Sequence, residues 1–353
     1  MLLIHRTITK ELIISFVVPL FGLNIILMME KILKLSRILT GIGATVLDFF
    51  KIIILIQPAL LLFTIPLAFF VSVLVTYGRM NMDNEIVALR SSGMTFGVLY
   101  RPVFLLSVVL LLISLAVSIY IMPRSHSRLR ETMNSLLKQR IVMAIEPGVF
   151  YDSFKGFMIL ARGKKPDGEY RGIFLYDESG KKENKMIYAR SGKIITDDEM
   201  KTYFRLADGL AHIVKGTTST VIKFREYTLN LSVEDELMGR KKNDMTIMEL
   251  YENARNKSNR KRMDYYIELH RRFSFPLLLL VFAILAPPLS LISGRSGRVS
   301  GLFMGLSVFT LYYMVLLYFE NLVRTNRLNH LFCWMPLLIL LLVSVVMYKR
   351  KNG

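Results

Sequence analysis

Residues 78–102 read GRMNMDNEIVALRSSGMTFGVLYRP, a polar stretch that separates two apolar runs, each long enough to cross a membrane. We expect a short helix over residues 83–92 of this stretch. Asp83 is placed to cap its first turn, and Gly93 is placed to end it in a left-handed conformation. A short helix that connects two membrane spans forms a rigid projection at the membrane surface.

The predicted helix is amphipathic. Met82, Ile86 and Leu89 fall on one face at helical spacing, whereas Glu85 and Arg90 lie off that face. Two interpretations fit this pattern equally well. The helix either rests on lipid headgroups at the membrane interface or docks into a soluble partner.

The chain contains six apolar runs that are long enough to cross about 30 Å of hydrocarbon at about 1.5 Å per helical residue. They hold no Asp, Glu, Lys or Arg and are Leu12–Met29, Ile52–Gly78, Pro102–Pro123, Phe273–Gly294, Val299–Phe319 and Leu328–Tyr348. We therefore predict an α-helical membrane protein with six transmembrane helices in two groups of three, in which Pro287 and Pro288 end or bend the fourth. The corresponding domains are residues 1–123, 124–272 and 273–353.

The stretch between the third and fourth runs has a different pattern. Arg124–Met143 and Asp244–Met263 are charged, helical in character and connect this stretch to the spans. Between them, from Glu146 to Val233, apolar and polar residues alternate over about eight short segments, separated by turn signals such as Pro166-Asp167-Gly168. This pattern predicts an antiparallel β-sandwich or jelly roll inserted between the two groups of spans.

The composition favours a lipid environment over nucleic acid. Of the 353 residues 53% are hydrophobic, and the formal net charge is +19. A basic surplus suits either partner, but the apolar runs favour lipid, and the basic residues of the insert are mixed with acidic ones and match no nucleic-acid motif. The single cysteine, Cys333, excludes an internal disulfide, and the first apolar run lacks the cleavage site of a signal peptide.

Basic residues follow the first apolar run in the sequence MEKILKLSRIL. Lys31, Lys34 and Arg37 continue the helix into the membrane interface. They either anchor the end of the span by snorkelling or meet an anionic lipid headgroup.

Glycines recur at a spacing of four at the start of the fifth run. Gly297, Gly301 and Gly305 line one stripe of a helix, which allows another helix to approach closely. The contact is expected either within the chain or with a partner.

The distribution of basic residues does not fix the orientation. The termini and the connections at 78–102 and 295–298 hold ten Lys and Arg, whereas the opposite short loops hold six, which favours cytoplasmic termini. The flanks of the insert add twelve more to the opposite side, and the full count then leans the other way.

Motifs of catalysis and cofactor binding are absent from the sequence. It contains no GxxxxGK[ST] loop, no HExxH pair and no GxSxG elbow, and its five histidines lack metal-ligand spacing. We therefore predict no catalytic, cofactor or metal site. The spans also lack the carboxylates that proton-coupled carriers use, so a transporter of this kind takes its energy from a partner. The alternatives are a membrane-anchored sensor or scaffold whose β-sandwich binds a protein, and an ion-driven carrier.

Four motifs together resemble the lipopolysaccharide export permease family over essentially the whole chain. They are GRMNMDNEIVALRSSGMT at 78–95, EPGVF at 146–150, DMTIMEL at 244–250, and the run from His270 through PPLSLISGRSGRVSG at 287–301. The chain is more similar to the F-type (LptF) than to the G-type (LptG) subunit of that family. The resemblance implies a non-catalytic permease subunit of an ABC transporter that extracts lipopolysaccharide from the inner membrane of a Gram-negative bacterium.

The resemblance also implies partners and an orientation. The partners are lipopolysaccharide, a sister permease subunit, a cytoplasmic ATPase dimer and a periplasmic bridge protein. The termini are expected in the cytoplasm and the jelly roll in the periplasm, which assigns the side that the charge count leaves open.

Site residues are implied in the same way. Residues 83–92 correspond to a coupling helix seated in a groove of the ATPase. Its expected contact residues are Asp83, Asn84, Glu85, Ile86, Leu89 and Arg90. The first and fifth spans correspond to a lateral gate facing the sister subunit. The expected headgroup contacts there are Lys31, Lys34 and Arg37, and the expected helix-packing residues are Gly297, Gly301 and Gly305.

Overall fold

The computed structural model describes residues 2–42, 45–143, 147–154, 157–180, 183–196, 202–215, 218–230, 242–256, 259, 261–291 and 297–352. The chain divides into two compact units. The helical unit comprises Met1–Leu39, Thr45–Leu129 and Arg240–Gly353, and the sheet unit comprises Thr40–Ala44 and Arg130–Gly239. The domain boundaries expected from the sequence stay a prediction.

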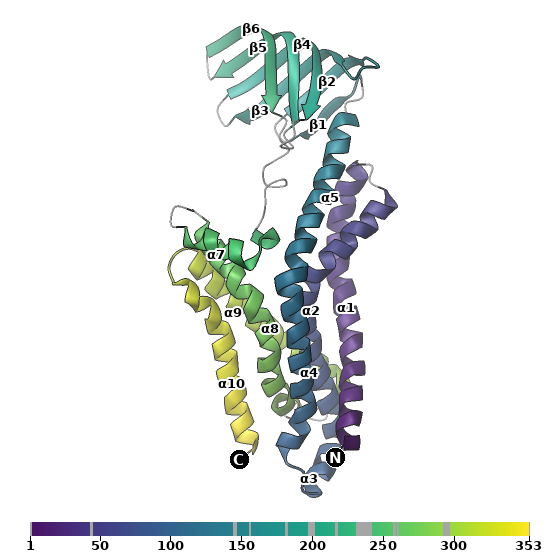
Figure 1. Cartoon of the computed structure of the whole chain (residues 1–353), viewed down its shortest axis with the longest axis vertical. Coiled ribbons are helices and arrows are strands. Elements are labelled where there is room, and N and C mark those ends of the chain that lie inside the picture. Colours follow the sequence, from purple (N-terminus) through teal and green to yellow (C-terminus); the bar gives the residue numbers. More distant parts are fainter. Residues whose placement is uncertain are drawn as a thin grey trace. The chain divides into compact units, whose positions relative to one another are not determined.

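The predicted layout of six spans with a β insert between the third and fourth is confirmed (Figure 1). The helices are α1 (Leu2–Ile42), α2 (Val46–Met82), α3 (Glu85–Ser91), α4 (Phe96–Ala116), the π-helix η1 (Val117–Ile121), α5 (Met122–Met143), the 3-10 helix η2 (Lys242–Asp244), α7 (Ile247–Arg255), α8 (Arg262–Ser290), α9 (Gly297–Arg324), the 3-10 helix η3 (His330–Trp334) and α10 (Met335–Asn352). Six stretches among the described residues are long and apolar enough to cross a membrane: Ile4–Ser36, Val46–Met82, Gly97–Leu136, Arg262–Ser290, Ser300–Arg324 and His330–Arg350.

Most of these helices are longer than the apolar runs that predict them, because polar residues sustain the helix beyond the hydrocarbon. α2 begins at a capping box in which Thr45 and Asp48 bond each other's backbone N–H groups. The third span continues past Pro123. The π-helix ends two residues before this proline and lets the helix continue although proline has no N–H group to donate a hydrogen bond. Pro287 and Pro288 lie in the last turn of α8, which ends at Ser290 as predicted.

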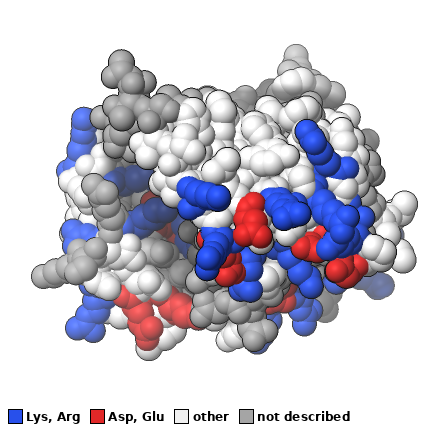
Figure 2. All heavy atoms as spheres, turned by 90° about the horizontal axis from the view of Figure 1, so that it is seen from above, with Lys and Arg blue, Asp and Glu red and all other residues white. Residues whose placement is uncertain are grey.

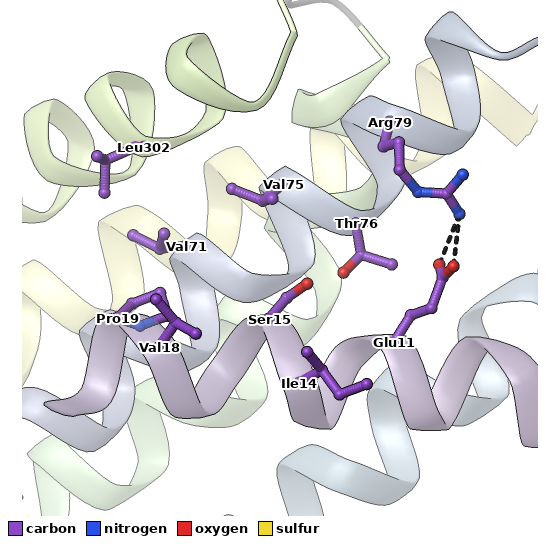
Figure 3. Close-up of a pocket in the computed structure, with 10 residues that line it drawn as sticks. All are labelled: Glu11, Ile14, Ser15, Val18, Pro19, Val71, Val75, Thr76, Arg79 and Leu302. Carbon is purple, nitrogen blue, oxygen red and sulfur yellow. Dashed lines mark hydrogen bonds and ion pairs between the residues drawn. The ribbon is translucent and has the colours of Figure 1, made fainter. Parts of the chain in front are cut away.

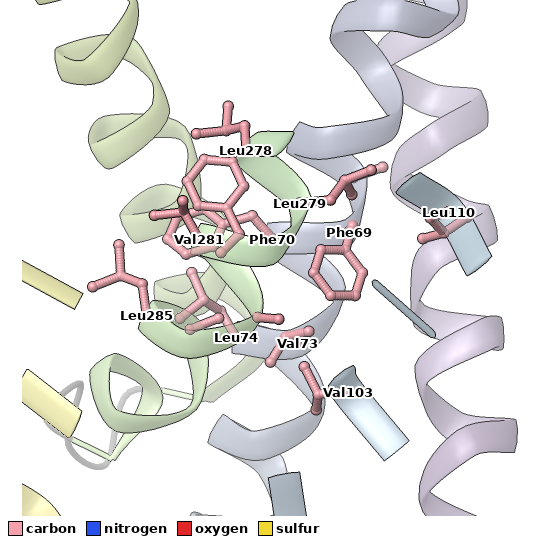
Figure 4. Close-up of a cluster of buried hydrophobic side chains, with 14 of the residues drawn as sticks. Phe69, Phe70, Val73, Leu74, Val103, Leu110, Leu278, Leu279, Val281 and Leu285 are labelled. Carbon is pink, nitrogen blue, oxygen red and sulfur yellow. The ribbon is translucent and has the colours of Figure 1, made fainter. Parts of the chain in front are cut away.

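α2 and α8 form the centre of the helical unit. Phe70 and Phe282 stack with ring centroids 4.1 Å apart where the two helices meet. Buried aromatic and aliphatic side chains from α2, α4 and α8 surround this pair (Figure 4). These two helices are the most buried of the six spans, so they form the core against which the outer spans pack.

The sequence predicts one charged helix over Asp244–Met263, and this prediction is wrong because the structure has two helices there. Thr246 and Glu249 form a capping box that starts α7, and Asn256 takes an extended conformation (φ −68°, ψ 105°) that ends it. α8 then begins separately at Arg262. The helical pattern of the sequence continues across this break because the intervening residues are polar and do not mark an end.

The sheet unit contains one six-stranded antiparallel sheet in which each strand pairs with the next along the chain. The strands are β1 (Phe150–Phe154), β2 (Phe157–Lys164), β3 (Tyr170–Gly180), β4 (Glu183–Thr196), β5 (Thr202–Lys215) and β6 (Thr218–Asn230). The rings of Tyr170 on β3 and Phe204 on β5 lie 6.1 Å apart although β4 runs between their strands. The sheet therefore curls over its own apolar face.

The β insert is as predicted, but its strands are fewer and longer than the eight short ones expected. Ser191-Gly192 and Asp208-Gly209 look like turns in the sequence, yet β4 and β5 run through them without a change of register. Gly192 is required there because a Cβ would lie 2.7 Å from Ile173 of β3. The described strands form a meander, whereas a jelly roll requires Greek-key connections.

Charged side chains of both signs share the surface seen in Figure 2. Lys and Arg side chains lie among Asp, Glu and uncharged residues on that face. The basic surplus of the sequence is therefore interspersed with acidic side chains there.

Candidate functional site

A cavity of about 810 Å³ lies within the helical unit, between α1, α2, α8 and α9. Its walls are mainly apolar. They are formed by Leu23, Ile26 and Leu27 of α1, Ile56, Leu60, Phe63 and Leu67 of α2, Phe275 of α8, and Phe309 and Tyr313 of α9. Walls of this composition and length suit hydrocarbon chains.

The same cavity also carries charged groups. The basic side chains that line it are Lys31 of α1, Lys242 of η2, and Arg271 and Arg272 of α8, together with His126 of α5. Glu30 and Glu268 line it as well, so cations outnumber carboxylates. A cavity that combines apolar walls with a cationic group of side chains is complementary to an amphiphile with an anionic headgroup.

Arg272 is the most deeply buried of these cations, with only 1% of its side chain exposed. Its Nη2 donates to the backbone carbonyls of Lys242 and Asn243, each at 3.3 Å. Its Nε lies 3.6 Å from a carboxylate oxygen of Glu268. Nε and Nη1 make no hydrogen bond among the described residues and are buried, so this guanidinium keeps donors that an acceptor reaches only if the surrounding side chains move.

The neighbouring Arg271 differs because its charge is already matched. Its Nε donates to Glu320 of α9 at 3.0 Å, and its Nη2 donates to the second oxygen of the same carboxylate. This bidentate pair joins α8 to α9 beside the cavity. Of the two adjacent arginines, Arg272 is therefore the one with unused donors.

The structure places the predicted gate cations at different positions along α1. Lys31 lines the cavity, whereas Lys34 is 69% exposed and pairs with Glu30 at 2.5 Å within α1. Arg37 lies in α1, but its side chain falls outside the described part of the chain. Of the two lysines, Lys31 thus lies among the other cations of the cavity, and the role of all three at a gate stays a prediction.

Sequence reasoning missed Arg271, Arg272, Lys242 and His126 as site residues, since it counted the basic ones only as flanks of the insert. A usable signal was present: two adjacent arginines stand directly before the apolar run of the fourth span. Charged residues at the end of or within a membrane span face the interior of the helix bundle or a cavity.

The second candidate site is the short helix α3, which is held against the end of α2. Ile86 is 3% exposed and Leu89 is half-buried, so these two predicted contact residues face the helical unit instead of solvent. Gly93 has φ 87° and ends the helix in a Schellman motif, in which the N–H groups of Gly93 and Met94 bond the carbonyls of Arg90 and Leu89. The left-handed end of the helix is as predicted.

The start of α3 differs from the prediction. Asp83 ends α2 instead of capping α3, because its carboxylate pairs with Arg79 at 2.8 Å. Asn84 occupies the N-cap position with φ 55° and makes no side-chain capping bond. Met82 belongs to α2 and is 42% exposed, so it does not share the buried face of Ile86.

The solvent-facing side of α3 combines apolar and charged groups. Val87 is 55% exposed, and Arg90 is exposed next to it along the helix. Glu85 is 42% exposed and pairs with Arg79 at 2.8 Å, so its carboxylate ties α3 to α2. The side of α3 available to a partner therefore centres on Val87.

Two of the predicted helix-packing glycines contact α2. A Cβ at Gly301 would lie 3.2 Å from backbone atoms of Leu74 and Val75, and one at Gly305 would lie 2.7 Å from a methyl group of Val71. Gly297 is the first residue of α9, and its surroundings fall outside the described side chains. The contact of Gly301 and Gly305 is therefore within the chain.

Replacing Gly301 by valine should destabilise the helical unit by about 1–3 kcal/mol, because the side chain meets the backbone of α2, which cannot turn aside. Gly22→Val in α1 is the matched control, since a Cβ at Gly22 meets nothing within 4 Å. Unfolding midpoints of the two variants in detergent measure the difference. Equal midpoints would show that α9 does not pack on α2 through this glycine.

Comparison with known proteins identifies related chains. The sequence model of the family described as "Lipopolysaccharide export system permease LptF/LptG" matches residues 6–350. The chain is 22% identical over 362 residues to an uncharacterized protein of Rickettsia prowazekii (strain Madrid E), covering 100% of both chains. It is 20% identical over 358 residues to the lipopolysaccharide export system permease protein LptF of Escherichia coli (strain K12), covering 98% of this chain and 94% of the relative.

Proposed function

Because the chain belongs to the lipopolysaccharide export system permease LptF/LptG family, we propose that it is an F-type permease subunit that extracts lipopolysaccharide from the inner membrane. The chain is a multi-pass membrane protein and a transporter component, not a classical enzyme. In this proposal an ATPase dimer on partner chains supplies the energy. The proposed remaining partners are a G-type sister subunit and a periplasmic bridge protein that receives the lipid.

The observation that carries this proposal is the cavity of about 810 Å³ with apolar walls and cationic side chains. Acyl chains gain roughly 25 cal/mol per Å² of apolar surface that they bury against α1, α2 and α9. In this proposal phosphate oxygens of the headgroup accept from Lys31, and from the buried donors of Arg272 once the side chains around it move aside. Both ends of an anionic glycolipid thus find complementary groups in one cavity.

The proposed orientation places the termini and α3 in the cytoplasm and the sheet unit in the periplasm. α3 then docks to the ATPase, with Val87 at the centre of the contact and Glu85 holding α3 to Arg79. Lys34 and Arg37 extend the cationic end of α1 in this proposal. An exposed apolar residue on a short helix that is fixed at both ends suits docking to a protein better than a purely lipid-resting role.

A photoreactive residue at Phe309 should crosslink to lipopolysaccharide in the membranes of a Gram-negative host, because this position lines the cavity. The same residue at Leu311 is the control, since Leu311 lies on the same helix and is 67% exposed outside the cavity. Equal yields at the two positions would mean that the lipid contacts α9 without entering the cavity.

Replacing Lys31 by glutamine should lower the crosslink at Phe309 by about tenfold, the equivalent of losing one charge-assisted contact of about 1.4 kcal/mol. Lys51→Gln is the matched control, because Lys51 is an exposed lysine of α2 that does not line the cavity. If both variants give the wild-type yield, Lys31 only anchors the end of α1.

A further inference from the structure

α1 packs on the rest of the helical unit through one face. On this face Ile8, Leu12 and Phe16 are at most 9% exposed and belong to the hydrophobic core of the bundle. Val18 and Phe21 lie off this face and are 70% and 63% exposed. α1 is among the least buried of the six spans, so few side chains hold it in place.

One guanidinium connects α1 to α3. Nη2 of Arg79 donates to both carboxylate oxygens of Glu11 on α1, at 2.7 and 2.8 Å. Nη1 of the same side chain donates to Glu85 on α3 at 2.8 Å, and to Asp83 at 2.8 Å. Arg79 itself stands near the end of α2, so three elements share one side chain. Figure 3 shows its pair with Glu11.

A cavity of about 560 Å³ lies beside this ion pair, between α1, α2 and α9. Ile14 and Val18 of α1 face Val71 and Val75 of α2 across it, and Glu11 and Arg79 line the same cavity (Figure 3). This space is not filled by packed side chains, so a displacement of α1 relative to α2 there would disrupt few core contacts. The ion pair is the polar connection across it that Figure 3 draws.

We propose that Arg79 is a positioning residue that transmits a displacement of α3 to α1, through Glu85 on one side and Glu11 on the other. This inference rests on the proposed function, in which α3 docks to the ATPase and α1 borders the lipid cavity. A guanidinium suits this role because its planar set of donors binds two carboxylates at once in fixed geometry, which a lysine does not.

The test uses the chain in complex with its ATPase and sister subunit, reconstituted in liposomes with lipopolysaccharide. Glu11→Gln removes the ion pair between Arg79 and α1 and leaves the ion pair between Arg79 and Glu85 of α3 intact. We expect the lipopolysaccharide released per ATP hydrolysed to fall by at least about fivefold, with ATPase binding unchanged. Lys10→Gln is the matched control, since Lys10 is the exposed neighbour of Glu11 on α1.

A second readout separates coupling from a merely structural role. Spin labels at Phe21→Cys and Leu311→Cys report the distance between α1 and α9, because both positions are more than 60% exposed. Cys333, the single native cysteine, is replaced by alanine in this background. The wild-type distance should change when ATP binds, Glu11→Gln should lose most of that change, and Glu11→Asp should restore part of it by keeping the charge.

Two outcomes would overturn the proposal. One is that the release per ATP and the distance change in Glu11→Gln both equal the wild-type values. The other is that Glu11→Gln fails to assemble with the ATPase although its docking helix is unchanged. A wild-type complex that hydrolyses ATP without releasing lipopolysaccharide would instead contradict the proposed function, whatever Glu11 does.

Discussion

Replacing Glu320 by leucine should reduce the free energy of unfolding by about 3–5 kcal/mol, because it leaves the Arg271 guanidinium without its partner in the bundle interior. The Glu320 side chain is only 4% exposed, and both oxygens accept from Arg271. The other cations of the cavity lie near Arg271, so no second carboxylate in the described part of the chain is free to replace the lost one. Unfolding of the purified chain in mixed micelles measures the loss.

Two comparisons make this prediction specific. The double variant Arg271→Met with Glu320→Leu should recover most of the lost stability, since no unpaired charge remains. Arg324→Gln, which breaks the pair between Arg324 and Asp264 at 2.9 Å, should cost less than about 1 kcal/mol because the Arg324 side chain is 51% exposed. A similar loss for Glu320→Leu and Arg324→Gln would mean that the Arg271 pair is hydrated in the membrane.

The second large effect is expected at the docking helix. Val87→Asp should weaken ATPase binding by well over about tenfold, because a carboxylate is then buried in the centre of the contact. The fold should survive, since Val87 is 55% exposed and stands outside the bundle core. Co-purification of the ATPase with the tagged chain measures the effect.

Val149→Asp is the matched control for this experiment, because Val149 is 47% exposed and belongs to the sheet unit. Its variant should retain the ATPase. If Val87→Asp also retains the ATPase in full, α3 is an interfacial helix that rests on lipid headgroups, which is the alternative that the sequence pattern left open.

The fold was predictable where a single local rule decides the structure. Long runs without charge specify the six spans, and a glycine after a short amphipathic segment specifies the left-handed end at Gly93. The buried face of α3 was predictable at Ile86 for the same reason, since periodicity places it toward α2. Strand count was not predictable in the same way, because Asp208-Gly209 satisfies the rule for a turn, yet Ala207 and Gly209 on either side of Asp208 pair with both neighbouring strands.

The candidate site was less predictable because it depends on pairs far apart in the sequence. The sequence predicts that Asp83 caps a helix, but in the structure its carboxylate pairs with Arg79. Arg79 also binds Glu11, which lies 68 residues earlier in the chain. Likewise, nothing local distinguishes Arg271 from Arg272, yet Glu320 of α9 satisfies one and leaves the other with unused donors. Such differences follow from tertiary contacts that single-sequence patterns do not encode.

The most direct test of the account is lipid release from liposomes that contain the chain, its ATPase and its sister subunit. We predict that lipopolysaccharide leaves the membrane to a soluble acceptor only while ATP is hydrolysed, and that Arg272→Gln lowers this release while ATP hydrolysis continues. Release that proceeds without ATP, or release by Arg272→Gln at the wild-type rate, would contradict a cavity that holds the lipid through its cations and is driven from outside the chain.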